Sequence, residues 1–304
     1  MAEQDMAEKT LEDNNDVFSD IINVLLFNGR REVKEDTLEQ ATPRSVYKAD
    51  KKLREQERDV AKYWRNINFR IALFGIENQT EPEPDIALRF MGYDGASYRD
   101  QLYYVKDENG KRKMNDNPRY MVVTLLLYFG SKHWDKPLTL YESLGEIPEE
   151  LKPYVNDYKV NLFEIAWLSD EQVEMFQSDF RIVADYFVQM RKNKDYVPSE
   201  RQITHVREVL QLMSVLTKDN RFEEVCNDLE EGVGLNMCDV LDRVENRGIQ
   251  AGIQTGIRRG QISEYIKIRK EDGYSEEEIT NGIIKRYRLT EEQADEYMHG
   301  MVTE

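Results

Sequence analysis

The stretch that decides the fold begins at residue 69 and reads Phe69-Arg-Ile-Ala-Leu-Phe-Gly-Ile-Glu-Asn-Gln-Thr80. Nearly every residue from 69 to 76 is apolar, on both of the faces that a strand presents, and Pro82 ends the run. A segment that is apolar on both faces is typical of a central strand covered on both sides. The sequence therefore predicts a sheet in the middle of the fold, with helices packed on it.

A second strand is predicted directly before this one, over residues 58–64, with a short polar turn around Asn66 and Asn68 between them. The two strands would form a hairpin. The remaining pattern predicts a helix from Asp16 to the Asn28-Gly29 stop, a charged helix over 50–57, a helix over 86–104, strands over 119–129 and 159–168, and a helix over 170–191. The order of these elements predicts a mixed α/β sheet flanked by helices.

The end of the chain carries a different pattern. After Pro198 no strand is expected, and Gly and Ile each recur every four residues between Gly248 and Gly260. Four glycines at helical spacing indicate either a helix face that another helix approaches closely or a flexible linker, and the sequence leaves both readings open. Two capping boxes follow, Ser275 with Glu278 and Thr290 with Gln293. We expect a disordered tail over 1–14, an α/β domain over 15–197 and an all-helical C-terminal extension over 198–304.

The composition is that of a soluble globular protein, with 304 residues of which 40% are hydrophobic and 33% charged. The longest apolar stretch, residues 121–129, is about half the length that a membrane-spanning helix needs, and the N-terminus is acidic rather than basic and apolar. We therefore expect a cytoplasmic protein without a membrane partner. The two cysteines, Cys226 and Cys238, have no metal-ligand spacing and are expected to be reduced packing residues.

The net charge of −17 argues against a nucleic-acid partner, because phosphate binding depends on lysine and arginine. The charge is unevenly distributed. Residues 28–70 hold twelve basic and eight acidic side chains, which gives +4 there and −21 in the rest of the chain. A basic stretch of this kind can bind a phosphate backbone, although such stretches are solvated surface at least as often. The tyrosines at 93, 98, 103 and 104 are more typical of core positions than of base-stacking ones.

Three polar residues at the hairpin ends are the candidate catalytic residues. Glu77 and Gln79 share one face of their strand, and a hairpin centred near Asn68 would place Asp59 opposite Glu77. A hard divalent cation would relieve the repulsion between the two carboxylates, and Mg²⁺ fits such oxygen ligands best. Gln79 would orient a nucleophilic water. The alternative is that Asp59 and Glu77 are solvated residues at strand ends, as most such residues are.

At these positions the sequence resembles a known family. The pieces Arg58-Asp59-Val60, Gly75-Ile-Glu77-Asn-Gln79-Thr80 and Leu88-Arg89-Phe-Met-Gly-Tyr93-Asp94 are similar to the recombination-promoting nuclease/putative transposase family, within the PD-(D/E)XK nuclease superfamily. The resemblance covers roughly residues 16–190, and the Gly-Ile segment also resembles C-terminal segments of that family. Gln79 stands where many superfamily members have lysine.

The resemblance implies a restriction-endonuclease-like fold and a metal-dependent DNA endonuclease linked to recombination or mobile elements. Asp59 and Glu77 match its metal carboxylates, Gln79 its catalytic amide position, and Asp20 an acidic residue of the first helix that can complete the Mg²⁺ site, with Mn²⁺ as a substitute. Arg58, Lys62 and Arg89 would contact DNA. Self-association through the Gly-Ile helix would give a homodimer with two sites for two strands. The alternative function is a nuclease-fold protein that no longer cuts and acts as a binding or assembly module.

Overall fold

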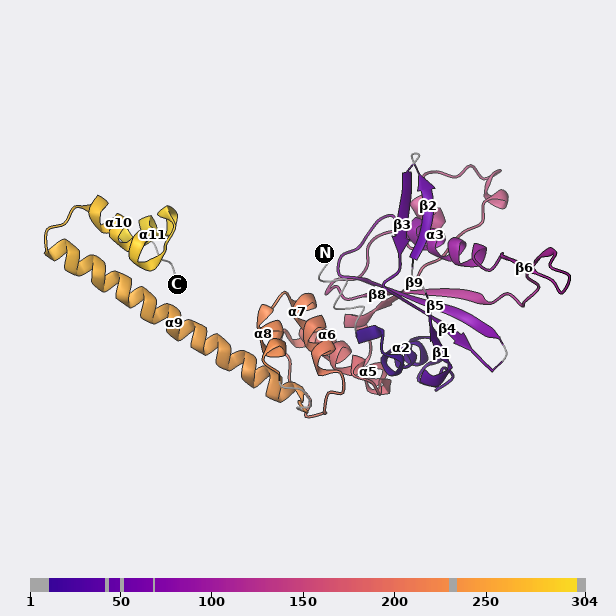
Figure 1. The fold of residues 1–304 in the computed structure, drawn as a ribbon, viewed down its shortest axis with the longest axis horizontal. Helices are drawn as coiled ribbons and strands as arrows, with labels where there is room; N and C mark the ends of the chain where they lie inside the picture. Colours follow the sequence, from indigo (N-terminus) through magenta and orange to yellow (C-terminus); the bar gives the residue numbers. More distant parts are fainter. Residues whose placement is uncertain (1–10, 42–43, 50–51, 68, 230–233, 300–304) are drawn as a thin grey trace. The chain divides into compact units, whose positions relative to one another are not determined.

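The computed structural model describes residues 11–41, 44–49, 52–67, 69–229 and 234–299, which form two compact units dividing between Val240 and Leu241 (Figure 1). This division lies beyond residue 197, where the sequence analysis placed the end of the α/β domain. Helices α6 (Phe180–Asn193) and α7 (Val206–Thr217) pack together, and the Asp179 carboxylate accepts hydrogen bonds from the backbone amides of Thr204 and His205. These contacts join the first helices after Pro198 to the larger unit.

The larger unit is built on a five-stranded mixed sheet. Its order is β1 (Leu38–Gln40), β4 (Val60–Arg65), β5 (Arg70–Gln79), β8 (Met121–Tyr128) and β9 (Asn161–Glu164). The pairs β1–β4 and β4–β5 are antiparallel, whereas β5–β8 and β8–β9 are parallel. Strand β5 is central and buried over most of its length, and it forms a hairpin with β4. Both predictions are confirmed.

Helices cover both faces of this sheet (Figure 1). Helix α3 (Ile86–Arg99) connects β5 to the parallel strand β8, and its Ile86 and Phe90 pack with Leu126 on one face. Helix α2 (Asn15–Phe27) covers the other face, where the ring of Phe27 lies 6.2 Å from that of Trp64. The predicted mixed α/β architecture with flanking helices is therefore correct.

Four local predictions differ from the structure. The charged helix expected over 50–57 is wrong, because β2 (Arg44–Ala49) and β3 (Lys52–Glu57) form an antiparallel hairpin. The helix expected over 170–191 is two helices, α5 (Asp170–Met175) and α6. The helix over 86–104 ends at Arg99, and the hairpin of β6 (Tyr104–Lys106) and β7 (Arg112–Met114) follows it. Residues 1–10 of the expected tail lie outside the described residues, but Leu11 and Glu12 are buried.

Shorter elements complete the larger unit. They are η1 (Glu35–Thr37), α4 (Leu140–Ser143), η2 (Lys152–Tyr154), η3 (Ile165–Trp167) and α8 (Asn220–Asn227). Cys226 is buried in α8 and, like Cys238, is a free thiol. None of the helices in the described part of the chain is both long and apolar enough to cross a membrane.

The second unit consists of most of the long helix α9 (Met237–Glu271) with α10 (Glu276–Tyr287) and α11 (Glu291–His299). The Gly-Ile segment lies inside α9, so the segment is helical and the linker reading is wrong. The close approach of another helix to its glycines stays a prediction, because a Cβ added at Gly252, Gly256 or Gly260 would meet no atom within 4 Å. Both expected capping boxes are present, Ser275 with Glu278 and Thr290 with Gln293.

Candidate active site

The candidate site lies where β4 begins and β5 ends, at one edge of the sheet. Val60 pairs with Ile76 in the antiparallel hairpin, and the same register extended by one residue places Asp59 beside Glu77. Glu77 and Gln79 are two residues apart on β5, so their side chains leave the sheet on the same face. The register predicted from the sequence is therefore confirmed at the pair Val60–Ile76, which adjoins Asp59 and Glu77.

A cleft of about 1000 Å³ opens at this edge. Four of the predicted site residues line it together: Asp59, Glu77, Gln79 and Arg89. The wall is completed by further residues that the sequence does not single out as site residues, among them Glu81, Glu83, Tyr93, Tyr186, Arg191 and Lys218. The cleft thus combines four carboxylates with three cationic side chains.

The charge of Glu77 is held within an ion-pair cluster. The Glu77 side chain is only 6% exposed, and the Arg89 guanidinium of α3 donates to it and, at 2.6 Å, to Glu83. Burial by itself would lower the pKa of the Arg89 guanidinium. The negative charges around it, that of Glu77 above all, have a larger combined effect, so the pKa of Arg89 is raised above its usual value. Burial and the nearby charge of Glu77 likewise raise the pKa of Tyr93, which therefore stays a neutral hydroxyl at ordinary pH.

Asp59 is fixed by the end of the neighbouring strand. Its Oδ2 accepts a hydrogen bond of 2.7 Å from the backbone amide of Asn78. The Asn78 side chain points to the opposite face, where its Nδ2 donates to Glu12 at 2.9 Å. Glu12 is 1% exposed. Glu12 lies in the segment that the sequence predicts to be a disordered tail, although Leu11 stands at helical spacing before Phe18 and is a signal that the helix pattern starts earlier.

The oxygen ligands available here suit Mg²⁺. This ion is commonly held by one or two carboxylates, with water completing its shell. Within the described ranges no group of three or more His, Cys, Asp and Glu side chains could hold a metal, so Asp59 and Glu77 would form a two-carboxylate site. The contact with Arg89 shows that Glu77 already attracts a cation. The residues present therefore fit Mg²⁺, in competition with the Arg89 guanidinium for Glu77.

Comparison with known proteins assigns the chain to a family. Residues 38–220, from the first residue of β1 to the first residue of α8, match the family model described as putative transposase, YhgA-like. The chain belongs to this family. The resemblance to recombination-promoting nucleases and putative transposases is thereby confirmed, and it indicates a function related to mobile elements and nucleic acid. No curated protein and no solved structure shows significant similarity to the chain.

In this YhgA-like protein two of the expected DNA contacts are internal. Arg58 is 1% exposed and donates to Thr124 at 3.1 Å, to Ser97 at 2.9 Å and to Asp94 at 2.8 Å. Lys62 is also 1% exposed, and its Nζ donates to Asn15 at 2.6 Å and to a backbone carbonyl. Both cations hold the sheet to its helices. Neither reaches a surface where it could bind a phosphate, so these two predictions are wrong.

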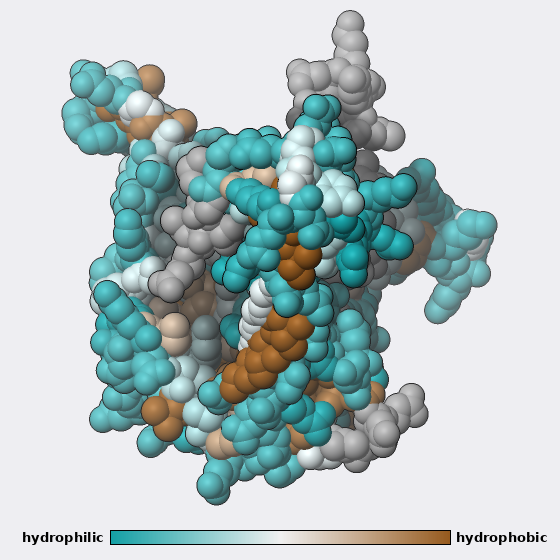
Figure 2. All heavy atoms as spheres, turned by 90° about the vertical axis from the view of Figure 1, so that its left-hand side faces the viewer, coloured by the Kyte–Doolittle hydropathy of each residue, from teal (hydrophilic) through white to brown (hydrophobic). Residues whose placement is uncertain are grey.

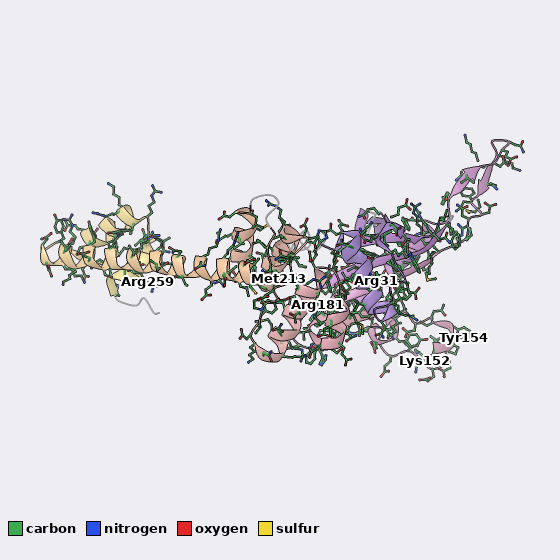
Figure 3. The ribbon with its side chains drawn as sticks, turned by 90° about the horizontal axis from the view of Figure 1, so that it is seen from below. Arg31, Lys152, Tyr154, Arg181, Met213 and Arg259 are labelled. Atoms are coloured by element: carbon green, nitrogen blue, oxygen red, sulfur yellow. The ribbon has the colours of Figure 1, made fainter. Side chains whose placement is uncertain are left out.

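Asp20 also has a structural position. Its Oδ2 accepts hydrogen bonds from the backbone amides of Gln177 and Ser178, at 2.8 and 2.7 Å. It lines a separate cavity of about 710 Å³ together with Arg31, which Figure 3 labels, and is not among the residues that line the cleft. The structure therefore does not bring Asp20 together with Asp59 and Glu77. Both Asp20 and Glu12 precede residues 38–220, the segment that matches the YhgA-like family model.

Proposed function

We propose that the chain is a Mg²⁺-dependent DNA endonuclease with a PD-(D/E)XK type of site, acting in recombination or in mobile elements. One observation supports this above the others: Asp59, Glu77 and Gln79 line a single cleft at the ends of two paired strands, in a member of a transposase-like family. The order and spacing of the three residues are those that the resemblance assigned to the superfamily motif.

Each cleft residue has a definable task in this proposal. Asp59 and Glu77 would hold Mg²⁺, or Mn²⁺ in its place; once bound, the ion supplies Lewis-acid polarisation of the phosphodiester and a lower pKa for the attacking water. Gln79 would accept a hydrogen bond from that water through its amide oxygen and point the water at phosphorus. Arg89, which now contacts Glu77, could then pair with a phosphate oxygen.

DNA also needs a cationic surface outside the cleft, and the β6–β7 hairpin offers one. Four of its side chains are basic and exposed, Lys106, Lys111, Arg112 and Lys113, against two acidic ones in the turn. Exposed tyrosines accompany them, since Tyr103 and Tyr104 are 47% and 54% exposed, contrary to the core positions expected for them. A two-stranded ribbon of this kind fits the major groove of DNA.

The hairpin contact can be tested without cleavage. In EDTA, the Lys111→Gln/Arg112→Gln variant should weaken DNA binding and lower the salt slope of log K by roughly 1.8, because each lost phosphate contact removes about 0.9. Lys285→Gln/Arg288→Gln in α10 and its cap is the matched control, with one exposed lysine and one exposed arginine replaced. An equal loss of slope in both variants would show that the hairpin makes no special contact.

Catalysis is tested with supercoiled plasmid. We expect nicking or linearisation in Mg²⁺ or Mn²⁺, none in EDTA, and none with Asp59→Asn or Glu77→Gln at wild-type amounts of folded protein. The competing function, a non-cutting binding or assembly module, is favoured by the Glu77–Arg89 contact and because, among the described residues, no three His, Cys, Asp or Glu side chains are grouped so that they could hold a metal. Plasmid that stays intact in both metals, while DNA binding persists, would establish that alternative.

A further inference from the structure

Helix α9 carries an apolar stripe that the second unit does not cover. Ile249, Ile253 and Ile257 are 51%, 49% and 50% exposed and recur every four residues. Beside them, a Cβ added at Gly252, Gly256 or Gly260 would meet no other atom within 4 Å. A narrow strip of hydrophobic side chains between hydrophilic ones is visible in Figure 2. The stripe is thus a row of isoleucine ridges alongside a row of glycine gaps.

The intrachain packing of α9 uses the other side of the helix. Ile262 and Ile266 are buried against α10 and α11, and they lie about 140–180° round the helix from Ile253. Arg258 donates to the backbone carbonyl of Tyr287, again away from the stripe. The exposed isoleucines therefore do not extend the face that packs on α10 and α11, and covering them requires a different occupant.

We propose that this occupant is the same stripe of a second copy, in antiparallel orientation. In one antiparallel register each isoleucine is level with a glycine of the partner chain along the helix axis: Ile249 with Gly260, Ile253 with Gly256, and Ile257 with Gly252. The isoleucine rows of the two chains are then offset along the axis, and the glycine rows let the two backbones approach closely. A two-fold pair presents the same patch from each chain, which is the commonest form of protein self-association.

The charges of α9 select the antiparallel arrangement over the parallel one. Residues 237–246 hold three acidic side chains and one basic, whereas residues 258–271 hold five basic and two acidic. An antiparallel pair places the acidic end of one helix against the basic end of the other, and Asp242 falls in register with Lys267. Glu245 and Glu264 share a register position too, but lie about 100° apart round the helix, on opposite flanks. A parallel pair would instead align like-charged ends.

Sedimentation of the full chain tests the stripe. We expect a dimer at micromolar concentration, and at least a tenfold weaker association for Ile253→Lys. Ile67→Lys is the matched control, because Ile67 is 97% exposed and lies in the other unit. Gly256→Leu should abolish the dimer while keeping the helix, since leucine fills the open space at position 256 that the partner helix needs for close approach, and leucine favours helix formation. A wild-type monomer, or a dimer that survives both stripe substitutions, overturns the proposal.

Orientation is tested with a spin label on Asp242→Cys, in a chain carrying Cys226→Ala and Cys238→Ser. The two labels of an antiparallel pair are separated by the length of about 25 residues, roughly 37 Å along the helices. Labels closer than about 20 Å would show a parallel pair and overturn the proposed register.

In the sedimentation experiment, Gly95→Leu controls for the size of the Gly256 substitution, because Gly95 is an exposed helical glycine whose Cβ would also meet nothing within 4 Å. Neither experiment depends on nuclease activity.

Discussion

The ion pair between Arg89 and Glu77 allows the metal proposal to be tested through folding stability. Arg89→Met removes a guanidinium that contacts two carboxylates, and leaves the Glu77 side chain, which is 6% exposed in the wild type, beside Asp59. Breaking a buried ion pair typically costs about 3–5 kcal/mol. Because the Arg89 side chain is 25% exposed, water can compensate part of that loss, and we expect a decrease of about 2–3 kcal/mol in the free energy of unfolding.

Urea unfolding followed by tryptophan fluorescence measures this value, first in EDTA and then in Mg²⁺. The double variant Glu77→Gln/Arg89→Met no longer buries the charge, so it should recover to within about 1 kcal/mol of the wild type. In Arg89→Met alone, Mg²⁺ no longer competes with the guanidinium and should restore about 2.7 kcal/mol at a concentration one hundred times its dissociation constant. Arg221→Met, which breaks the more exposed pair with Asp219, is the control and should cost less than about 1 kcal/mol. A single variant as stable as the control, or one that Mg²⁺ does not stabilise, would refute the reasoning.

Three further predictions concern single positions. Gly75→Ala should lower the free energy of unfolding by about 1–3 kcal/mol, because its Cβ would stand 2.5 Å from Cδ of the buried Arg58. Gly95→Ala has open space around it and should raise the free energy of unfolding by roughly 0.5–1 kcal/mol. Chemical denaturation compares the two variants. Burial lowers the pKa of Lys62, so on raising the pH the folded state releases the Lys62 proton before the unfolded state does. The stability of the wild type relative to Lys62→Met should therefore rise with pH in the window just below 10.5, as urea titrations at several pH values would show. Gln79→Lys should retain or increase cleavage and Gln79→Leu should lose it; equal rates for both and the wild type would exclude an amide role.

The sequence predicts the central hairpin well because its information is local. The apolar run of β5 marks a strand covered on both sides, and a turn between residues 65 and 70 leaves little choice of register. That register brings Asp59 and Glu77 to one edge of the sheet. The same local reasoning should have found the β6–β7 hairpin, because Asn109-Gly110 is a typical hairpin dipeptide and Gly110 adopts a φ of 75°.

The remaining errors concern partners that lie far away in the chain. Arg58 finds Thr124, Ser97 and Asp94 only once β8 and α3 have packed on β5, so its burial cannot be read from the charged segment around it. The break between α5 and α6 also has a distant partner, because Asp20 binds the backbone of the connecting residues from α2. The strong helix formers of β3, residues 52–57, similarly form a strand because they pair with β2.

The burial of Arg58 and Lys62 changes how an acidic protein of this kind could approach DNA. Two of the twelve cations that make residues 28–70 basic are used inside the fold, so the local excess of positive charge there does not translate into an equal surface potential. At physiological ionic strength, however, exposed charges are screened beyond about 8 Å, and the net charge of −17 acts only weakly on a phosphate at a cationic contact. On the proposed function, DNA binding would then be decided by the few cations within reach of the phosphate backbone, those of the β6–β7 hairpin and the cleft. So small a set implies weak binding by one copy, with a salt slope of about −0.9 for each phosphate that it contacts. Pairing two copies through α9 would join two such surfaces and raise the effective concentration of the second contact, which ties the use of DNA as a substrate to self-association.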